Sequence, residues 1–294
     1  MAITASMVKE LRDATGAGMM DAKKALVEND GNFDASVDFL RKKGMASAAK
    51  KSGRIASEGL VFTTSSGNKG VVLEVNSETD FVAKNDTFKE FVEKLSNIVL
   101  NTGTTDVEAL KAETYEGSTT VGDKLIELVA KIGENMNIRR ATLLEVPNGV
   151  VSGYVHMGGK IGVLVAIEGT GDKLAEVARH VAMHVAASNP QYLDRTSIDQ
   201  EVLDKEASIY KEQAAGKPEN IVEKIVEGRL NKFCEEICLV DQAFVMDTDR
   251  KVGQVVAEAA EGAKLSSYVR FALGEGIEKK EEDFAAEVAA TMAS

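Results

Sequence analysis

The chain has 294 residues, 44% of them hydrophobic, and a net charge of −12. That length allows more than one hydrophobic core, since single cores stop growing near ~250–300 residues. The acidic balance argues against generic binding to nucleic-acid backbones, which needs clustered Lys and Arg. With no apolar run of the ~20 residues that span a membrane and no apolar signal core at the N-terminus, we expect a cytoplasmic protein without membrane or direct nucleic-acid partners.

The first 50 residues predict three short helices. Thr4 is placed to cap a helix over "ASMVKELRDAT", which Gly16 ends. A second helix is expected over 19–29, with Gly31 in the stop position, and a third over "DASVDFLRKK". Such a unit resembles a ubiquitin-associated-like bundle, whose usual role is binding. The basic stretch 41–54 is interpreted as a solvated connector, although it could also contact RNA or an acidic protein.

Two similar α+β units are predicted beyond the basic stretch. "GLVFTTSSGNKGVVLEVN" indicates a β-hairpin with a Ser-Ser-Gly-Asn turn, followed by a helix over "TFKEFVEKLSNIVL". "GYVHMGGKIGVLVAIEG" indicates a second hairpin, followed by a helix over "DKLAEVARHVAMHVAAS". This faint repeat suggests two related subdomains. The stretch 101–124 lies within the first unit and is interpreted as a lineage-specific loop.

Phe81 raises a question, because it stands among polar residues in "VNSETDFVAKND". About twelve residues separate strand from helix here, and only about six in the second unit. The extra residues lie around "TDFVA", and the scaffold can join strand to helix without them. Phe81 therefore either folds back into its own core or is held out for a partner, and the extra loop indicates a separate function.

The C-terminal part begins with a charged segment, 198–230, which predicts two polar helices joined at "AGKPEN". We expect this helical hairpin to project from the body, where it is available for self-association. "CLVDQAFVMD" and "SSYVRFALGEGIE" predict strands, with a short helix over "KVGQVVAEAAEG" between them. "DFAAEVAATM" predicts an amphipathic terminal helix.

Motifs that would carry catalytic chemistry are incomplete. A phosphate-binding P-loop needs Gly-Lys followed by Ser or Thr, but this chain has "GKI" and "GKP". "GAGMMD" and "GEGIEK" lack the third glycine of the dinucleotide-binding pattern. These failures favour a protein-binding protein over an enzyme, and we expect no cofactor.

Two pairs of residues are candidate metal ligands. His180 and His184 are four apart on one helix, but Val181 stands where the metalloprotease pattern needs Glu, so packing is the simpler interpretation. Cys234 and Cys238 are also four apart, and we expect small buried residues in a reducing compartment. We therefore expect no metal site.

Long motifs carry a family resemblance. "VKELRDATGAGMMDAKKAL" and "NSETDFVAKND" closely resemble bacterial translation elongation factor Ts, as do "KIGENMNIRR", "AMHVAASNP" and "GEGIEKKEEDFAAEVAA". The resemblance covers nearly the whole chain in the expected order; Ala22 stands where the family often has cysteine, another small residue. It implies a guanine nucleotide exchange factor that binds elongation factor Tu in its GDP form, displaces Mg²⁺ and promotes GDP release, so that GTP can bind. The alternative is a generic ubiquitin-associated-like binding module.

The resemblance also implies which residues contact elongation factor Tu. Four residues are expected to wedge into its GTPase domain beside the Mg²⁺ site: Thr79, Asp80, Phe81 and Val82. Further contacts are implied for Arg12, Met19, Met20 and His156. From the residues alone, the first three could equally be a surface arginine and core methionines, and the last a plain strand-edge histidine.

The expected fold is α+β, with a ubiquitin-associated-like three-helix bundle, two related α+β core subdomains, a projecting helical hairpin and a C-terminal helix. The expected units, in chain order, are the helical domain 1–53, core N-subdomain 54–144, first part of the core C-subdomain 145–195, helical hairpin 196–232, second part of the core C-subdomain 233–274 and C-terminal module 275–294.

Overall fold

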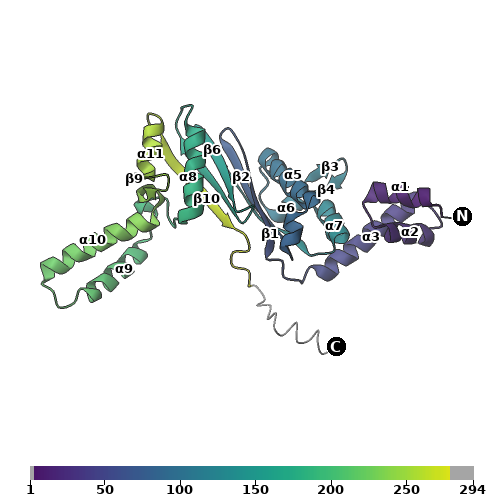
Figure 1. Ribbon diagram of the computed structural model, residues 1–294, viewed down its shortest axis with the longest axis horizontal. Helices are drawn as coiled ribbons and strands as arrows, with labels where there is room; N and C mark the ends of the chain where they lie inside the picture. The colour runs from purple at the N-terminus through teal and green to yellow at the C-terminus, as the bar shows by residue number, and fades with distance from the viewer. Residues whose placement is uncertain (1–2, 279–294) are drawn as a thin grey trace.

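The computed structural model describes residues 3–278, and it confirms the α+β fold class. Figure 1 shows an elongated molecule, with α1–α3 at one end, the sheets in the middle and α9 and α10 at the other end. The predicted terminal helix over "DFAAEVAATM" lies outside the described residues.

The N-terminal bundle forms as its capping residues predict. Its helices are α1 (Ala5–Thr15), α2 (Met19–Glu28) and α3 (Phe33–Lys51). The Thr4 hydroxyl accepts a hydrogen bond from the Met7 N–H at 3.3 Å, and Gly16 ends α1 in the left-handed conformation. Leu11 and Leu26 are fully buried between the helices.

The basic stretch 41–54 is largely solvent-exposed and connects the bundle to the core, as expected, but it is helical, because α3 continues through it to Lys51. Its part up to Lys51 contains three alanines and no proline, which favours a helix, and α3 ends just before Gly53. Gly44 is buried where α3 crosses α7 (Val121–Ile132), and a Cβ at Gly44 would lie 3.5 Å from the Ala130 side chain. Helix α3 therefore joins the bundle to the core as a packed element.

The first core unit is a three-stranded antiparallel sheet in the order β1-β2-β5, covered by helices. Its strands are β1 (Glu58–Ser66), β2 (Lys69–Ser77) and β5 (Met136–Glu145), and its longest helix is α5 (Asp86–Thr102). The hairpin and α5 match their predictions, whereas β5 and α7 were not predicted. The stretch 101–124 is structured, with α6 (Val107–Ala112), β3 (Thr114–Glu116) and β4 (Thr119–Thr120).

The second core unit repeats this plan with the strand order β10-β7-β6. Its elements are β6 (Gly149–His156), β7 (Ile161–Glu168), α8 (Leu174–Ser188), α11 (Val252–Ala259) and β10 (Lys264–Ala272). The predicted strand over "CLVDQAFVMD" is only partly right, since the chain forms a 3-10 turn at Leu239–Asp241 and then a small hairpin of β8 (Ala243–Phe244) and β9 (Asp247–Lys251).

The two sheets pack against each other through a shared hydrophobic cluster. Val61 and Val72 of the first sheet contact Leu164 and Phe271 of the second. A Cβ at Gly162 would lie 2.5 Å from Val61 Cγ1, so glycine is needed where the sheets approach most closely. Because helices cover the outer faces, β2 and β7 are buried on both sides, which explains the nearly continuous apolar sequence of β7 and the apolar run at 71–73 in β2.

A buried ion network joins three strands at one edge of this sandwich. The Glu74 carboxylate of β2 is 0% exposed and accepts hydrogen bonds from Arg139 Nη1 at 3.0 Å, Arg140 Nε at 2.7 Å and the Gly274 N–H at 2.8 Å. Burial alone would raise the pKa of Glu74, but the hydrogen bonds from Gly274, Asn76 and the two arginines outweigh it and lower the pKa. The carboxylate is therefore held ionised.

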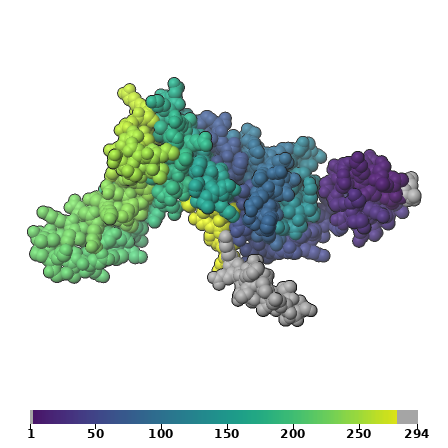
Figure 2. Space-filling view, in the orientation of Figure 1, coloured from purple at the N-terminus to yellow at the C-terminus, as the bar shows by residue number. Residues whose placement is uncertain are grey.

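The helical hairpin of α9 (Gln200–Gln213) and α10 (Glu219–Ile237) stands clear of the body in Figure 2. Every residue of α9 is exposed or half-buried. At its base, Ile198, Leu203, Cys234 and Ile237 form a small hydrophobic cluster. The hairpin is therefore attached through its base.

We predict that replacing residues 204–230 with a short Gly-Ser linker leaves the fold intact. The change retains the cluster at the hairpin base, so the melting midpoint should stay within about 5 °C of the parent value. Circular dichroism melting checks this, and loss of a cooperative transition would show that the hairpin belongs to the core.

Candidate functional site

The segment containing Phe81 is a short helix, α4 (Asp80–Lys84), so the expectation of a loop is wrong. An acidic residue in the first turn favours a helix there. The Phe81 side chain is 77% exposed, whereas Val82 is buried in the core of the first unit. Helix α4 is thus fixed on one side and presents a phenylalanine to solvent on the other.

Polar contacts hold the residue before α4. The Thr79 N–H and hydroxyl donate hydrogen bonds to the two Glu134 carboxylate oxygens, at 2.9 Å and 2.7 Å. The Ser77 hydroxyl donates to the Thr79 carbonyl at 2.9 Å. The entry to α4 is therefore bonded both to its own strand and to the turn before β5.

Asp80 lies beside Phe81 and is also solvent-accessible. The Lys84 ammonium donates a 2.6 Å hydrogen bond to Asp80, and Lys84 Nζ lies 5.7 Å from the centroid of the Phe81 ring. This hydrogen bond, with the charges of Lys84 and Lys160, lowers the pKa of Asp80 below its ordinary value. Helix α4 thus presents an aromatic ring next to an ionised carboxylate.

The turn after His156 lies at the same end of β1 as α4. The Tyr154 hydroxyl and His156 Nδ1 are 3.0 Å apart. The Val61 N–H donates to the Gly159 carbonyl at 2.8 Å, which fastens the turn to the first sheet. Met157, next to His156, has a positive φ and is 70% exposed. Sequence reasoning missed Met157, because a methionine in a glycine-rich turn gives no sign of its exposure.

The N-terminal candidates lie on a separate surface. Met19 and Met20, at the start of α2, are 61% and 74% exposed, which excludes the core interpretation. Arg12 pairs with Asp13 at 3.0 Å and is also accessible. Figure 1 places α1 and α2 at the end of the molecule, and α3 runs from them toward the sheets. The structure therefore brings Asp80 and the turn after His156 close together. Arg12, Met19 and Met20 lie away from them.

A third exposed apolar site was missed because the sequence there was interpreted as a strand. Val245 and Met246 form the β8–β9 turn and are both exposed. Met246 borders a shallow groove that also includes Val177 of α8 and Val255 of α11. A turn between two short strands, and not a strand interior, explains this exposure.

The candidate metal ligands have other roles. His184 is buried; its Nδ1 accepts from the Val245 N–H at 3.1 Å, and its Nε2 lies 2.8 Å from the Gln242 side-chain oxygen. Both ring nitrogens are thus used, and burial lowers the pKa of His184. Cys238 is also buried, which raises its pKa to about 11 and favours the unreactive thiol.

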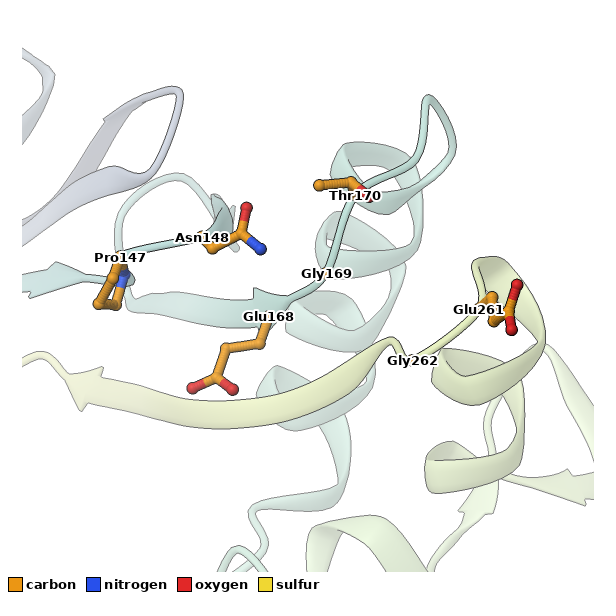
Figure 3. Close-up of a pocket in the computed structure, with 7 residues that line it drawn as sticks. All are labelled: Pro147, Asn148, Glu168, Gly169, Thr170, Glu261 and Gly262. Carbon is orange, nitrogen blue, oxygen red and sulfur yellow. The ribbon is translucent and has the colours of Figure 1, made fainter.

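A pocket at the edge of the second sheet contains none of the predicted site residues. Figure 3 shows Pro147 and Glu261 on opposite sides of the view with Glu168 between them, and Glu168 accepts a hydrogen bond from the Ser266 hydroxyl at 3.1 Å. The pocket is lined by Pro147, Asn148, Glu168, Gly169, Thr170, Glu261 and Gly262.

Within residues 3–278, no cluster of three or more His, Cys, Asp or Glu side chains is arranged to hold a metal ion. No helix in that same range combines the length and apolar character needed to cross a membrane.

Comparison with known proteins gives one family throughout. The family model described as "Elongation factor TS" matches residues 78–275. An "Elongation factor Ts" of Magnetococcus marinus is 56% identical over 98% of this chain and 98% of its own length. Proteins of the same name from Paramagnetospirillum magneticum and Rhodopseudomonas palustris are each 54% identical over 98% of this chain, and over 96% and 97% of their own lengths.

The lowered pKa of His184 predicts a pH-dependent stability. The fold favours the neutral ring, so this contribution is fully present above the ordinary value of 6.5 and is lost as the pH falls from there toward the lower folded-state pKa. As the pH is lowered, the free energy of unfolding of His184→Gln should therefore fall less steeply than that of the parent protein. Urea denaturation between about pH 8 and pH 5 measures this, and identical slopes in the two proteins would contradict it.

Proposed function

Because this chain belongs to the elongation factor Ts family, we propose that it is the guanine nucleotide exchange factor of elongation factor Tu. It binds the GDP form, displaces Mg²⁺ and promotes GDP release, so that GTP can bind. This activity makes and breaks no covalent bond, and it belongs in the cytoplasm, where translation takes place.

The observation that supports this proposal most directly is the exposed Phe81 on an anchored helix. An exposed phenylalanine does little for the stability of the free protein, and its burial against a partner contributes about 2–3 kcal/mol. Asp80 beside it is ionised and can accept a hydrogen bond at the mouth of an opened pocket. Segment 79–82 is therefore suited to act as a wedge in the GTPase domain of the partner.

The binding free energies involved require contacts beyond this wedge. A GTPase that holds GDP at ~1 nM has about 12 kcal/mol of binding free energy to offset. One phenylalanine cannot supply this, so the remainder comes from a wide interface that forms fully only when the nucleotide site is distorted. Arg12, Met19 and Met20 on the bundle and His156 on the second hairpin are proposed as such contacts. Met157, which is exposed next to His156, is proposed to extend the contact surface around His156.

A second partner surface is proposed on the projecting hairpin. Ile209 of α9 and Ile221 of α10 are both exposed on otherwise polar helices. This thin apolar seam makes the hairpin available for self-association, which analytical ultracentrifugation of the parent and the hairpin-replaced protein would test.

We predict that Phe81→Ala slows exchange far more than it changes folding. Truncating a buried aromatic anchor at an interface typically costs about 2–4 kcal/mol, and about 2.7 kcal/mol corresponds to about a hundredfold in rate. Asp80→Ala should be milder, because a group at a pocket mouth stays partly solvated. Stopped-flow release of fluorescent GDP from elongation factor Tu, beside thermal melting, measures both effects.

The matched control for Phe81→Ala is Met45→Ala, which removes an exposed apolar side chain of α3 that belongs to none of the proposed partner surfaces and should leave exchange unchanged. If Phe81→Ala instead melts many degrees lower and exchanges normally per folded molecule, Phe81 is a packing residue and segment 79–82 is not the wedge.

The bundle is tested better by substitution than by deletion. Removing residues 1–53 would also remove α3 and uncover the α7 surface on which Gly44 packs. We predict that Met19→Ala combined with Met20→Ala weakens the affinity for elongation factor Tu at least about tenfold, because two exposed anchors are lost. The melting midpoint should not move. Isothermal titration calorimetry measures the affinity, and parent-like binding would remove the bundle from the interface.

A further inference from the structure

Thr79 occupies the N-cap position of α4 but does not cap it. A threonine there usually accepts a hydrogen bond from a backbone N–H of the first helical turn. Thr79 has the extended backbone of an N-cap residue, yet its side chain makes no such bond. Its hydroxyl instead donates to Glu134 Oε1 at 2.7 Å, while its N–H donates to Glu134 Oε2 at 2.9 Å. Both oxygens of one carboxylate are thus bound to one residue.

The neighbouring residues on each side are bonded as well. The Asn135 N–H donates to Glu78 Oε1 at 2.5 Å, so two consecutive residues after β2 are bonded to two consecutive residues before β5. We call Glu78, Thr79, Glu134 and Asn135 the bracket. Arg54, after α3, joins the bracket through the Asn135 side chain, which donates to the Arg54 carbonyl at 2.7 Å.

The bracket is placed where α4 needs support. A helix of five residues is not stable by its own hydrogen bonds. Val82 and Ala83 anchor α4 in the core, but Phe81 is 77% exposed, and the Lys84 ammonium 5.7 Å from its ring centroid is itself on an exposed side chain, so contacts around the ring hold its direction only weakly. Its direction depends on how α4 leaves β2, and Thr79 and its bonds to Glu134 determine that exit.

We propose that Glu134 is a positioning residue for nucleotide exchange, which acts through Thr79 to hold Phe81 in its exposed orientation. This inference rests on the function proposed above. A side chain that pushes into a nucleotide site must not be pushed aside by the partner. The two hydrogen bonds from Thr79 to the Glu134 carboxylate resist rotation of the chain at the entry to α4. Charge-assisted hydrogen bonds are roughly twice as strong as neutral ones, which suits this task.

The test is a double-mutant cycle between Glu134→Ala and Phe81→Ala. Glu134→Ala should slow the maximal rate of GDP release about tenfold, the size expected for losing a charge-assisted hydrogen bond, while affinity for nucleotide-free elongation factor Tu changes much less. In the Phe81→Ala background the same change should have almost no further effect on the rate, because its action passes through Phe81.

A conservative variant separates positioning from stability. Glu134→Gln keeps one acceptor oxygen for the Thr79 hydroxyl or N–H, so it should lose clearly less of the exchange rate than Glu134→Ala. Glu127→Ala, which removes an exposed carboxylate of α7 paired with Lys124, is the matched control and should leave exchange unchanged. All rates are read well below each variant's melting midpoint, so loss of folded protein does not contribute.

The outcomes are distinct for the two proposals. If Phe81→Ala exchanges normally, the wedge itself is wrong and the role of Glu134 falls with it. If Phe81→Ala slows exchange but Glu134→Ala does not, Glu134 has no positioning role, although the wedge proposal survives. The same holds if the double variant is slower by the product of the two single fold-changes, because the two residues then act independently. A Glu134→Ala variant that only melts lower, with a parent-like rate per folded molecule, also overturns the inference.

Discussion

The buried carboxylate of Glu74 constrains the architecture more than any other single group. An isolated ionised carboxylate in a protein interior costs several kcal/mol, so every hydrogen bond to it must form together. The donors are Arg139 and Arg140 of β5, Asn76 of β2 and the N–H of Gly274, just after β10. The network therefore requires that β5 lies beside β2. It also requires that the C-terminal end of β10 packs against the first sheet. It fixes the strand that leads directly into α4.

Much of the fold follows from local sequence signals, and the two main exceptions, β5 and the extension of α3, have different origins. Thr4, Gly16 and the Ser-Ser-Gly-Asn turn act locally, and the structure has the elements that they predict. Strand β5 was missed because its arginines resemble surface residues. They are half-buried because they pair with the buried Glu74, and this pairing of residues 65 and 66 positions apart leaves no local pattern. The extension of α3 was missed because a run of lysines was taken as a sign of a connector.

The candidate site could be located from the sequence but not described. The unequal spacing between strand and helix in the two units marks segment 79–82 as an insertion with its own purpose. The spacing cannot distinguish an inward from an outward Phe81, because that depends on which side of α4 meets the core. In the structure Val82 takes the core side, which leaves Phe81 exposed. The proximity of Asp80 and Lys160 depends on how the two sheets pack, which no local pattern reports.

In the function proposed above, the exposed apolar side chains would serve binding without serving folding. Phe81, Met157 and Met246 lie on short elements or turns, and Met20 lies at the start of a helix. Each element is held by hydrogen bonds or by a buried neighbour, so the exposed side chain contributes little to the stability of the free protein. Its burial is available when a partner docks. In the proposed complex these side chains are spread along the length of the molecule, so full contact requires the partner to match their spacing, and a partner that must distort to do so has its own equilibrium shifted.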